Sequence, residues 1–299
     1  MSGPLIDVDR RVATAYFDRK PFHVGHALCR HPLFALPRLM ELARSLPEAF
    51  VEYNGGALPV GARPEETPRT GLSPEETVRR IAECGSWMVL KRVEQDGEYG
   101  ELLDRCLDEL AERAGPALPR MQRREGFIFL SSPGAVTPFH LDPEHNFLLQ
   151  VRGSKTVSMW DRDDRFVLPD AELEKFYAAF VHRNLPWQDI FQTTAWTVPL
   201  QPGQGLHFPV AVPHWVKNGP EVSISFSITF RSDDSERRAL VYRANARLRK
   251  LGLSPRPPGE SIILDRTKRA AFEALAALRD LARRARPSAA ARADAPPGE

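Results

Sequence analysis

The chain has 299 residues, with 41 Lys and Arg residues against 39 Asp and Glu residues, and a formal net charge of +2. Its cysteines, Cys29, Cys84 and Cys106, contain no C-x-x-C pair, which argues against a disulfide framework or zinc ribbon and favours a reducing compartment, here the cytoplasm. No apolar run approaches the length of a membrane span, and no apolar signal core follows residues 1–4. With 8 histidines and few cysteines, any metal chemistry is expected to use His and carboxylate ligands.

Charge is unevenly distributed. Residues 232–299 contain 15 basic and 9 acidic residues, a net charge of +6, which leaves −4 for the first 231 residues. The sequence therefore predicts an acidic body with a basic C-terminal extension. Most of the basic residues lie opposite apolar stripes, so we expect a solvated helix face rather than a nucleic-acid-binding surface.

Residues 1–119 are predicted to form an N-terminal α/β segment that flanks the main domain. Apolar residues recur at helical spacing over 32–46 and again from Leu102 to Leu110, where Gly115 and Pro116 end the second helix. Ser73 and the Pro and Glu residues after it are typical of a helix start, and a strand is expected over 86–93.

From Arg120 the pattern changes to short strands separated by Gly, Pro or Asp turns. The clearest runs from Val222 to Phe230, where apolar residues alternate with Ser or Thr, as expected for a strand with one apolar and one polar face. A helical insert is expected near 170–182. Many short strands with turn signals predict a mainly β domain over 120–231, such as a jelly roll.

Two further apolar stripes predict a C-terminal helical segment over 232–286, interrupted by the Pro- and Gly-rich residues 254–259. Residues 287–299 are rich in Ala, Arg and Pro and are predicted to be a disordered tail. The apolar stripes need partners, which could be the barrel or a second copy of the chain in a homodimer.

One short motif could carry chemistry. His140 and Asp142 are two residues apart, so on a strand both side chains project from one face. His214 could supply a third ligand, which gives the two-His, one-carboxylate set of non-haem Fe(II) oxygenases, with coordination positions left open for a 2-oxo acid and O₂. Taken alone, His-x-Asp is a weak signal, and a polar, solvent-facing strand edge is the alternative interpretation.

The surrounding spacing makes the motif more specific. Five residues separate Gly134 from His-x-Asp, and a Pro-Gly turn at 202–203 leads to a strand that ends at Pro209, five residues before His214. Over about 120–231 the chain resembles the JmjC/cupin-like Fe(II)- and 2-oxoglutarate-dependent oxygenases. It resembles in particular the asparaginyl hydroxylase that inhibits the hypoxia-inducible factor, and bacterial cupin-like proteins. The resemblance implies a double-stranded β-helix core.

The same resemblance implies further site residues. Thr137 stands where the family has a Thr that bonds a 2-oxoglutarate carboxylate, and Asn146 stands where the family has an Asn. Lys155, in a Gly-x-Lys turn, matches the family's Lys that pairs with the distal carboxylate. Ser227 replaces an Asn of the asparaginyl hydroxylase, and we expect the Ser and Thr residues of this last strand to line the cavity and leave room for cosubstrate.

The implied function is that of an Fe(II)/2-oxoglutarate-dependent dioxygenase, a hydroxylase whose only catalytic centre is the metal. Its prime substrate would be a protein or peptide side chain, or a small molecule, with no membrane or nucleic-acid partner. Two alternatives remain open. One is a metal-binding cupin that acts as a sensor or regulator without turnover, and the other is a JmjC-type demethylase that needs the basic tail.

Two other histidines lie near these residues in the sequence. His145 follows His140 by an odd offset, so we expect it at the surface or beside the metal ligands rather than among them. His207 is a weaker ligand candidate than His214, and could form a hydrogen bond inside the barrel.

Overall fold

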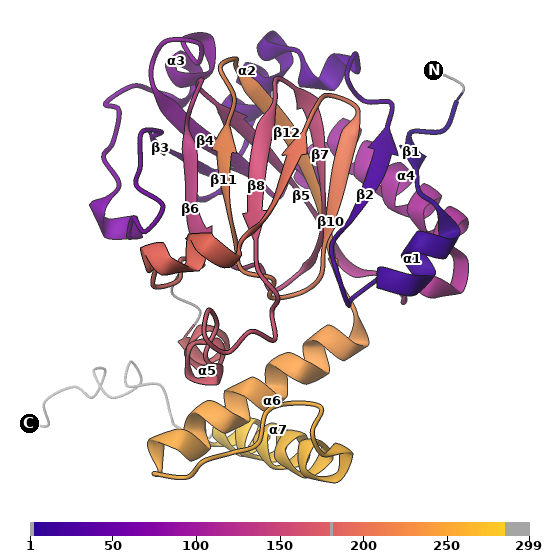
Figure 1. Ribbon diagram of the computed structural model, residues 1–299, viewed down its shortest axis with the longest axis vertical. Coiled ribbons are helices and arrows are strands. Elements are labelled where there is room, and N and C mark those ends of the chain that lie inside the picture. Colours follow the sequence, from indigo (N-terminus) through magenta and orange to yellow (C-terminus); the bar gives the residue numbers. More distant parts are fainter. Residues whose placement is uncertain (1–2, 180–181, 285–299) are drawn as a thin grey trace, which may run out of the picture.

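Two antiparallel sheets face one another in the computed structural model, which describes residues 3–179 and 182–284 (Figure 1). The larger sheet has the strand order β1-β2-β10-β7-β12-β5-β4-β3, and the smaller sheet has the order β6-β11-β8-β9. The strands of the larger sheet are β1 (Ile6–Asp7), β2 (Phe22–His26), β3 (Val51–Gly55), β4 (Ser86–Lys91), β5 (Gln122–Ser131), β7 (His145–Arg152), β10 (Gln204–Phe208) and β12 (Ser223–Arg231). Those of the smaller sheet are β6 (Val136–His140), β8 (Lys155–Met159), β9 (Trp196–Leu200) and β11 (His214–Asn218).

The space between the sheets has an apolar part and a polar part. Leu148 and Leu206 of the larger sheet pack against Val157 and Val216 of the smaller one, and all four are nearly fully buried. The predicted alternation along β12 is present, but both of its faces are buried. Its apolar residues pack against the N-terminal helices, while its serines face the interior and bond to side chains of β7. The mainly β fold with flanking helices is therefore confirmed.

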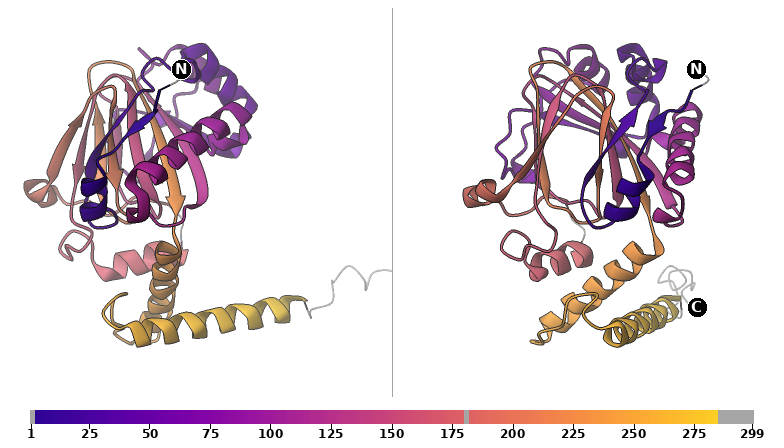
Figure 2. Two further views of the ribbon diagram at one scale, coloured as in Figure 1. Left: turned by 90° about the vertical axis from the view of Figure 1, so that its right-hand side faces the viewer. Right: turned by 45° about the vertical axis from the view of Figure 1, so that its right-hand side comes forward.

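The N-terminal residues extend the larger sheet and cover it. β2 pairs with β10 at one side, and β4 pairs with β5 at the other. Helices pack on the outer face of this sheet, as Figure 2 shows. They are α1 (Arg10–Tyr16), α2 (Leu36–Ser45), α3 (Pro74–Arg79) and α4 (Gly97–Ala114). Strands from both sides of residue 120 thus share one sheet. The predicted division of the chain into segments at that residue stays a prediction.

The longest of these helices illustrates how the sequence sets its ends. Asp96 caps the first turn of α4 by accepting hydrogen bonds from two backbone N–H groups, and Gly115 follows the last turn with a φ of 59°. The stripe predicted from Leu102 to Leu110 is buried against the larger sheet. Burial of this one face fixes the helix on the sheet.

Three helices lie at one end of the barrel (Figure 1). They are α5 (Asp170–Ala179), α6 (Asp233–Lys250) and α7 (Ile262–Arg284). β12 leads directly into α6 through Ser232, whose side chain caps the helix by accepting from the N–H of Ser235. The predicted tail at 287–299 lies outside the described residues. No helix in the described ranges has the length and apolar character that crossing a membrane requires.

Candidate metal centre

The three predicted ligands lie together at the end of the barrel that faces these helices. His140 is the last residue of β6 and His214 is the first of β11, and the two are paired opposite one another in the sheet. One ligand atom from each of His140, Asp142 and His214 lies within 4.8 Å of the other two. The structure thus places all three predicted ligands around one point.

An irregularity in strand pairing sets which side chains face this point. β11 pairs with β6 so that His214 is opposite His140 but Val216 is opposite Thr137, with a register shift between the two pairs. His214 and Val216 are two residues apart on β11, so their side chains face the same side of the sheet. Their partners on β6, His140 and Thr137, therefore also face one side, although they are three residues apart. Without this bulge Thr137 and His140 would face opposite sides of the sheet.

Both histidines are oriented for metal binding by backbone carbonyl groups. His140 Nδ1 lies 2.7 Å from the carbonyl oxygen of Pro138, and His214 Nδ1 lies 3.0 Å from that of Val212. A proton on each Nδ1 satisfies these contacts and leaves the Nε2 lone pairs for a metal ion. Burial lowers the pKa of His140 to about 3 and also lowers the pKa of His214, so both rings are neutral at pH 7.

The carboxylate is held by an arginine from a distant part of the chain. Arg183 donates to Oδ1 of Asp142, and Oδ2 lies 3.8 Å from Nε2 of His214. Burial would raise the pKa of Asp142, but Arg183 and the two histidines outweigh it and hold that pKa below its ordinary value. The ion pair engages one oxygen and leaves the other facing the imidazoles, which suits monodentate metal binding.

Arg183 belongs to a buried ion-pair network that sequence reasoning missed. It also donates to Glu144 at 3.0 Å, and Arg231 donates to the other oxygen of Glu144 at 3.0 Å. Glu144 is only 2% exposed. The partners come from a turn, the segment after α5 and the end of β12, so no local spacing connects them.

Lys155 occupies the opposite end of the same strand pair. It begins β8 and is paired with Asn218, whereas the last residue of β8 is paired with His214. The two residue pairs are four positions apart along the strands, which corresponds to about 13 Å. Because four is an even number, the side chains of His214 and Asn218 face the same side of the sheet. Lys155 is 5% exposed, and burial alone lowers its pKa to about 7, because no carboxylate of the described chain compensates it.

The turn before Lys155 accepts only glycine. Gly153 has a φ of 64°, and a Cβ atom there would lie 2.4 Å from the carbonyl oxygen of Val222. The start of β8, and with it the position of the lysine along the strand, is fixed by this close approach of the two backbones.

Asn146 and Ser227 lie beside the metal ligands. Asn146 Nδ2 lies 3.4 Å from Oδ2 of Asp142, and the hydroxyl of Ser227 donates to Oδ1 of Asn146 at 2.6 Å. Ser227 therefore orients the amide that contacts the carboxylate ligand. The cosubstrate contacts expected of Thr137, Asn146, Lys155 and Ser227 remain predictions.

The expectation of a surface position for His145 is wrong. His145 and His207 are 1% and 0% exposed, and both rings stack on Phe17, with centroids 4.8 Å and 4.9 Å away. They lie on the outer face of the larger sheet, which the segment after α1 covers. His207 bonds the carbonyl oxygen of Asn146 through Nδ1, and neither histidine belongs to the metal-ligand group.

No family model matches the chain. The sequence is 30% identical over 108 residues to the Jumonji C domain-containing protein 5 of Drosophila melanogaster. That match covers 33% of this chain and about a quarter (26%) of the fly protein.

Among solved structures, ycfD of E. coli superposes with a TM-score of 0.52 at 18% identity, covering 91% of this chain and 68% of that one. A second structure is described as YcfD, a ribosomal oxygenase from Escherichia coli, in complex with cobalt and 2-oxoglutarate. It gives a TM-score of 0.46 at 16% identity, covering 88% and 64% of the two chains.

The chain has the jelly-roll fold of the JmjC oxygenases, and the predicted resemblance to the JmjC/cupin-like group is confirmed. In particular, it is similar in sequence to the fly JmjC protein over 108 residues and similar in fold to ycfD.

Proposed function

We propose that this protein is an Fe(II)- and 2-oxoglutarate-dependent dioxygenase that hydroxylates a protein or peptide side chain in the cytoplasm. The observation that carries the proposal is the buried, uncompensated ammonium of Lys155 on the same sheet face as a two-His, one-carboxylate group. When bound, iron, 2-oxoglutarate and O₂ supply the oxidising chemistry of a hydroxylation.

The donor set fits ferrous iron. Two neutral imidazoles and one carboxylate oxygen are borderline and hard ligands, and no thiol joins the group of described residues. Asp142 would bind a metal ion through one oxygen, because Arg183 engages the other. Three protein ligands leave coordination positions for a 2-oxo acid and for O₂.

The lysine fits a dicarboxylate. A buried ammonium without a counterion is unfavourable, so a carboxylate that reaches it gains a strong charge-assisted hydrogen bond. An acid whose other end chelates the metal would join the two ends of the β8–β11 pair. The register shift supports a role for Thr137, which shares this face and would bond the same cosubstrate.

The direct test is succinate formation. Purified protein incubated with Fe(II), ascorbate and 2-oxoglutarate should release succinate, and this should be lost in His140→Ala. We expect Lys155→Ala to retain metal but to require far more 2-oxoglutarate. Metal binding without succinate under any condition would favour the sensor alternative instead.

The substrate proposal follows the fold relative described as a ribosomal oxygenase. Ribosomal proteins are therefore the first substrates to screen, with a mass increase of one oxygen as the readout. Loss of a methyl group in the same screen, dependent on residues 232–299, would favour the demethylase alternative.

We also propose a homodimer through the C-terminal helices. α7 packs on α6 but leaves large apolar side chains in solvent. Ile262 is 70% exposed, Ile263 77%, Leu275 50% and Leu278 62%. A second copy that covers this surface would remove apolar area from water.

A further inference from the structure

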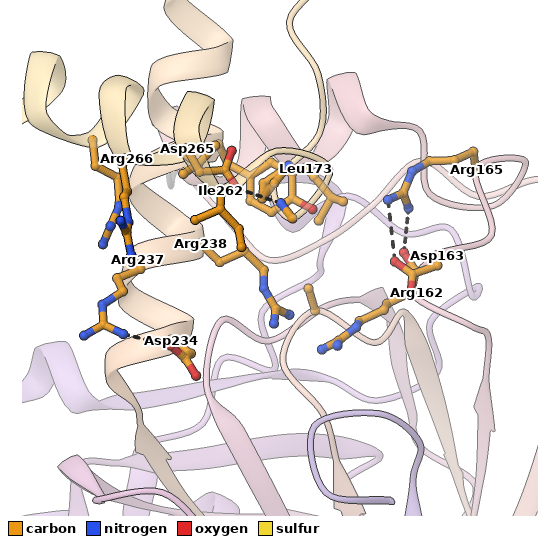
Figure 3. Close-up of a pocket in the computed structure, with 16 residues that line it drawn as sticks. Arg162, Asp163, Arg165, Leu173, Asp234, Arg237, Arg238, Ile262, Asp265 and Arg266 are labelled. Carbon is orange, nitrogen blue, oxygen red and sulfur yellow. Dashed lines mark hydrogen bonds and ion pairs between the residues drawn. The ribbon is translucent and has the colours of Figure 1, made fainter.

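An open cleft of about 800 Å³ lies between the helical end of the barrel and the C-terminal helices. One wall is formed by α6 and α7, and the other includes Arg162, Asp163 and Arg165, which follow β8 (Figure 3). Ala211 also lines the cleft. The metal-centre residues do not line this cleft, and no role in the proposed chemistry accounts for it.

The cleft is rich in guanidinium groups that lack a full complement of carboxylates. Six arginines line it against three aspartates. The arginines are Arg162, Arg165, Arg237, Arg238, Arg266 and Arg269. Arg162 and Arg238 extend toward one another in Figure 3, and both pair with the single carboxylate of Asp18, at 2.9 Å and 3.1 Å.

Arg266 and Arg269 of the cleft lie on α7. Neither Arg266 nor Arg269 has a hydrogen-bond or ion-pair partner in the part of the chain that the structure describes. Asp265, beside them, accepts from the backbone N–H of Gly259 at 2.8 Å. Arg237 pairs with Asp234 at 3.0 Å, but both side chains are more than half exposed, so a ligand could compete for this guanidinium.

The cleft borders the loop that leads to a metal ligand. Ala211 lines the cleft, and its backbone N–H donates to the carbonyl oxygen of Asp142 at 2.9 Å. Arg162 donates to the carbonyl oxygen of Val210 at 3.2 Å. Since this loop continues to His214, a chain bound in the cleft would lie at the same end of the barrel as the metal centre.

We propose that the cleft binds an acidic segment of the polypeptide substrate, next to the residue that reaches the metal centre; this rests on the proposed function. Guanidinium groups pair with carboxylates through two parallel hydrogen bonds, so several in one cleft recognise closely spaced Asp or Glu side chains.

Two observations favour a peptide over single-stranded nucleic acid. Among the described residues that line the cleft, Tyr242 is the only aromatic one, and it is 6% exposed, so it offers no platform for base stacking. Three aspartates in the walls interrupt the positive surface that a continuous phosphate backbone would follow.

The test measures binding without metal or turnover. Fluorescence anisotropy of a fluorescein-labelled hexaglutamate peptide gives its Kd for the full chain. We expect the Arg266→Glu/Arg269→Glu variant to bind about tenfold more weakly or worse, and binding to the unmodified protein to weaken as salt rises.

The matched control is Arg120→Glu/Arg152→Glu, which makes the same change of charge at two exposed arginines outside the cleft and should retain affinity. An Arg266→Gln/Arg269→Gln variant, checked by thermal melting, separates loss of binding from loss of folding.

Equal affinity in the cleft and control variants would overturn the proposal, as would equal binding of hexalysine. So would a uridine hexanucleotide that binds more tightly than the peptide and depends on the same arginines. If the peptide binds through the cleft but no succinate forms, only the proposed function fails; if succinate forms but the peptide does not bind, only the cleft proposal fails.

Discussion

At the scale of single residues, Lys155 is both buried and ionisable. A buried ammonium is unfavourable for folding, yet it is the group that a dicarboxylate cosubstrate requires. Its lowered pKa therefore has consequences both for binding and for stability.

Binding of 2-oxoglutarate should depend on pH through this lysine. With a pKa of about 7 in the cosubstrate-free protein, Lys155 is increasingly neutral at higher pH, so binding must supply its proton. We expect the affinity to fall above pH 7, by at most about tenfold per pH unit. Calorimetric titration of the Co(II)-loaded protein at several pH values measures this. Lys155→Met should bind 2-oxoglutarate more weakly, and its affinity should not fall with pH above 7. If the affinity of this variant still fell with pH, Lys155 would not be the group responsible.

The free energy of unfolding should rise with pH, whereas the affinity for 2-oxoglutarate should fall. The pKa of Lys155 is lower in the folded chain than its ordinary value of 10.5, so the unfolded chain binds the extra proton between about pH 7 and 10.5. The stability of the cosubstrate-free protein therefore rises with pH across this window. Lys155→Met should melt at a higher temperature than the unmodified protein at pH 7, and the difference should shrink by pH 9. The exposed Lys250→Met is the control, and equal melting of all three proteins would refute this account.

We expect Arg183 to influence metal binding through Asp142. Replacing it with Met leaves both oxygens of Asp142 free to turn and removes one partner of the buried Glu144. We expect metal affinity to fall about 10- to 100-fold, as is usual when a group that orients a ligand is lost. Titration with Co(II), followed by its absorption bands, checks this. Arg124→Met, which also removes an arginine with two carboxylate partners, should leave the affinity unchanged.

At the scale of elements, two strand features assemble the site. The bulge between β6 and β11 brings Thr137 and His140 to one face. The small hydroxyl side chains of β12 bond to Asn146 and Gln150 of β7 and so fill little of the space between the sheets. Hydrogen bonds to β7 occupy the hydroxyl groups of Ser225 and Ser227, and the expectation that this face lines a cavity with room for cosubstrate stays a prediction.

The exposed stripe of α7 makes the proposed dimer testable. Leu275 and Leu278 are three residues apart and so lie on one helix face. The Leu275→Asp/Leu278→Asp variant should be monomeric by light scattering at a concentration where the unmodified chain is a dimer, because burying two carboxylates at an interface is unfavourable. Ala277→Asp, exposed on the opposite side of the helix, should remain a dimer. A monomeric unmodified chain would exclude this interface.

At the scale of the whole molecule, the sequence predicts those features that depend on residues close together in the chain. The apolar stripe of α4 is present because one face of that helix is buried. The alternation along β12 is present because its two buried faces differ, one packing against apolar residues and the other forming hydrogen bonds to β7. The triad was predictable because a strand pair and two short turns create it. His145 was misplaced because its burial depends on Phe17, which lies far away in sequence. Arg183 left no signal because its contact with Asp142 spans 41 residues.

The geometry of the Gly153 turn has a consequence for cosubstrate selectivity. The predicted metal ligands lie at one end of the β8–β11 pair and Lys155 at the other, and backbone pairing fixes the distance between them. The fixed distance between the two ends of the β8–β11 pair would therefore favour a diacid of one length. One methylene more or less would leave either the metal or the ammonium without its oxygen partner, so 2-oxoglutarate would be distinguished from its shorter and longer homologues by strand register, and redesigning side chains alone would not transfer that preference.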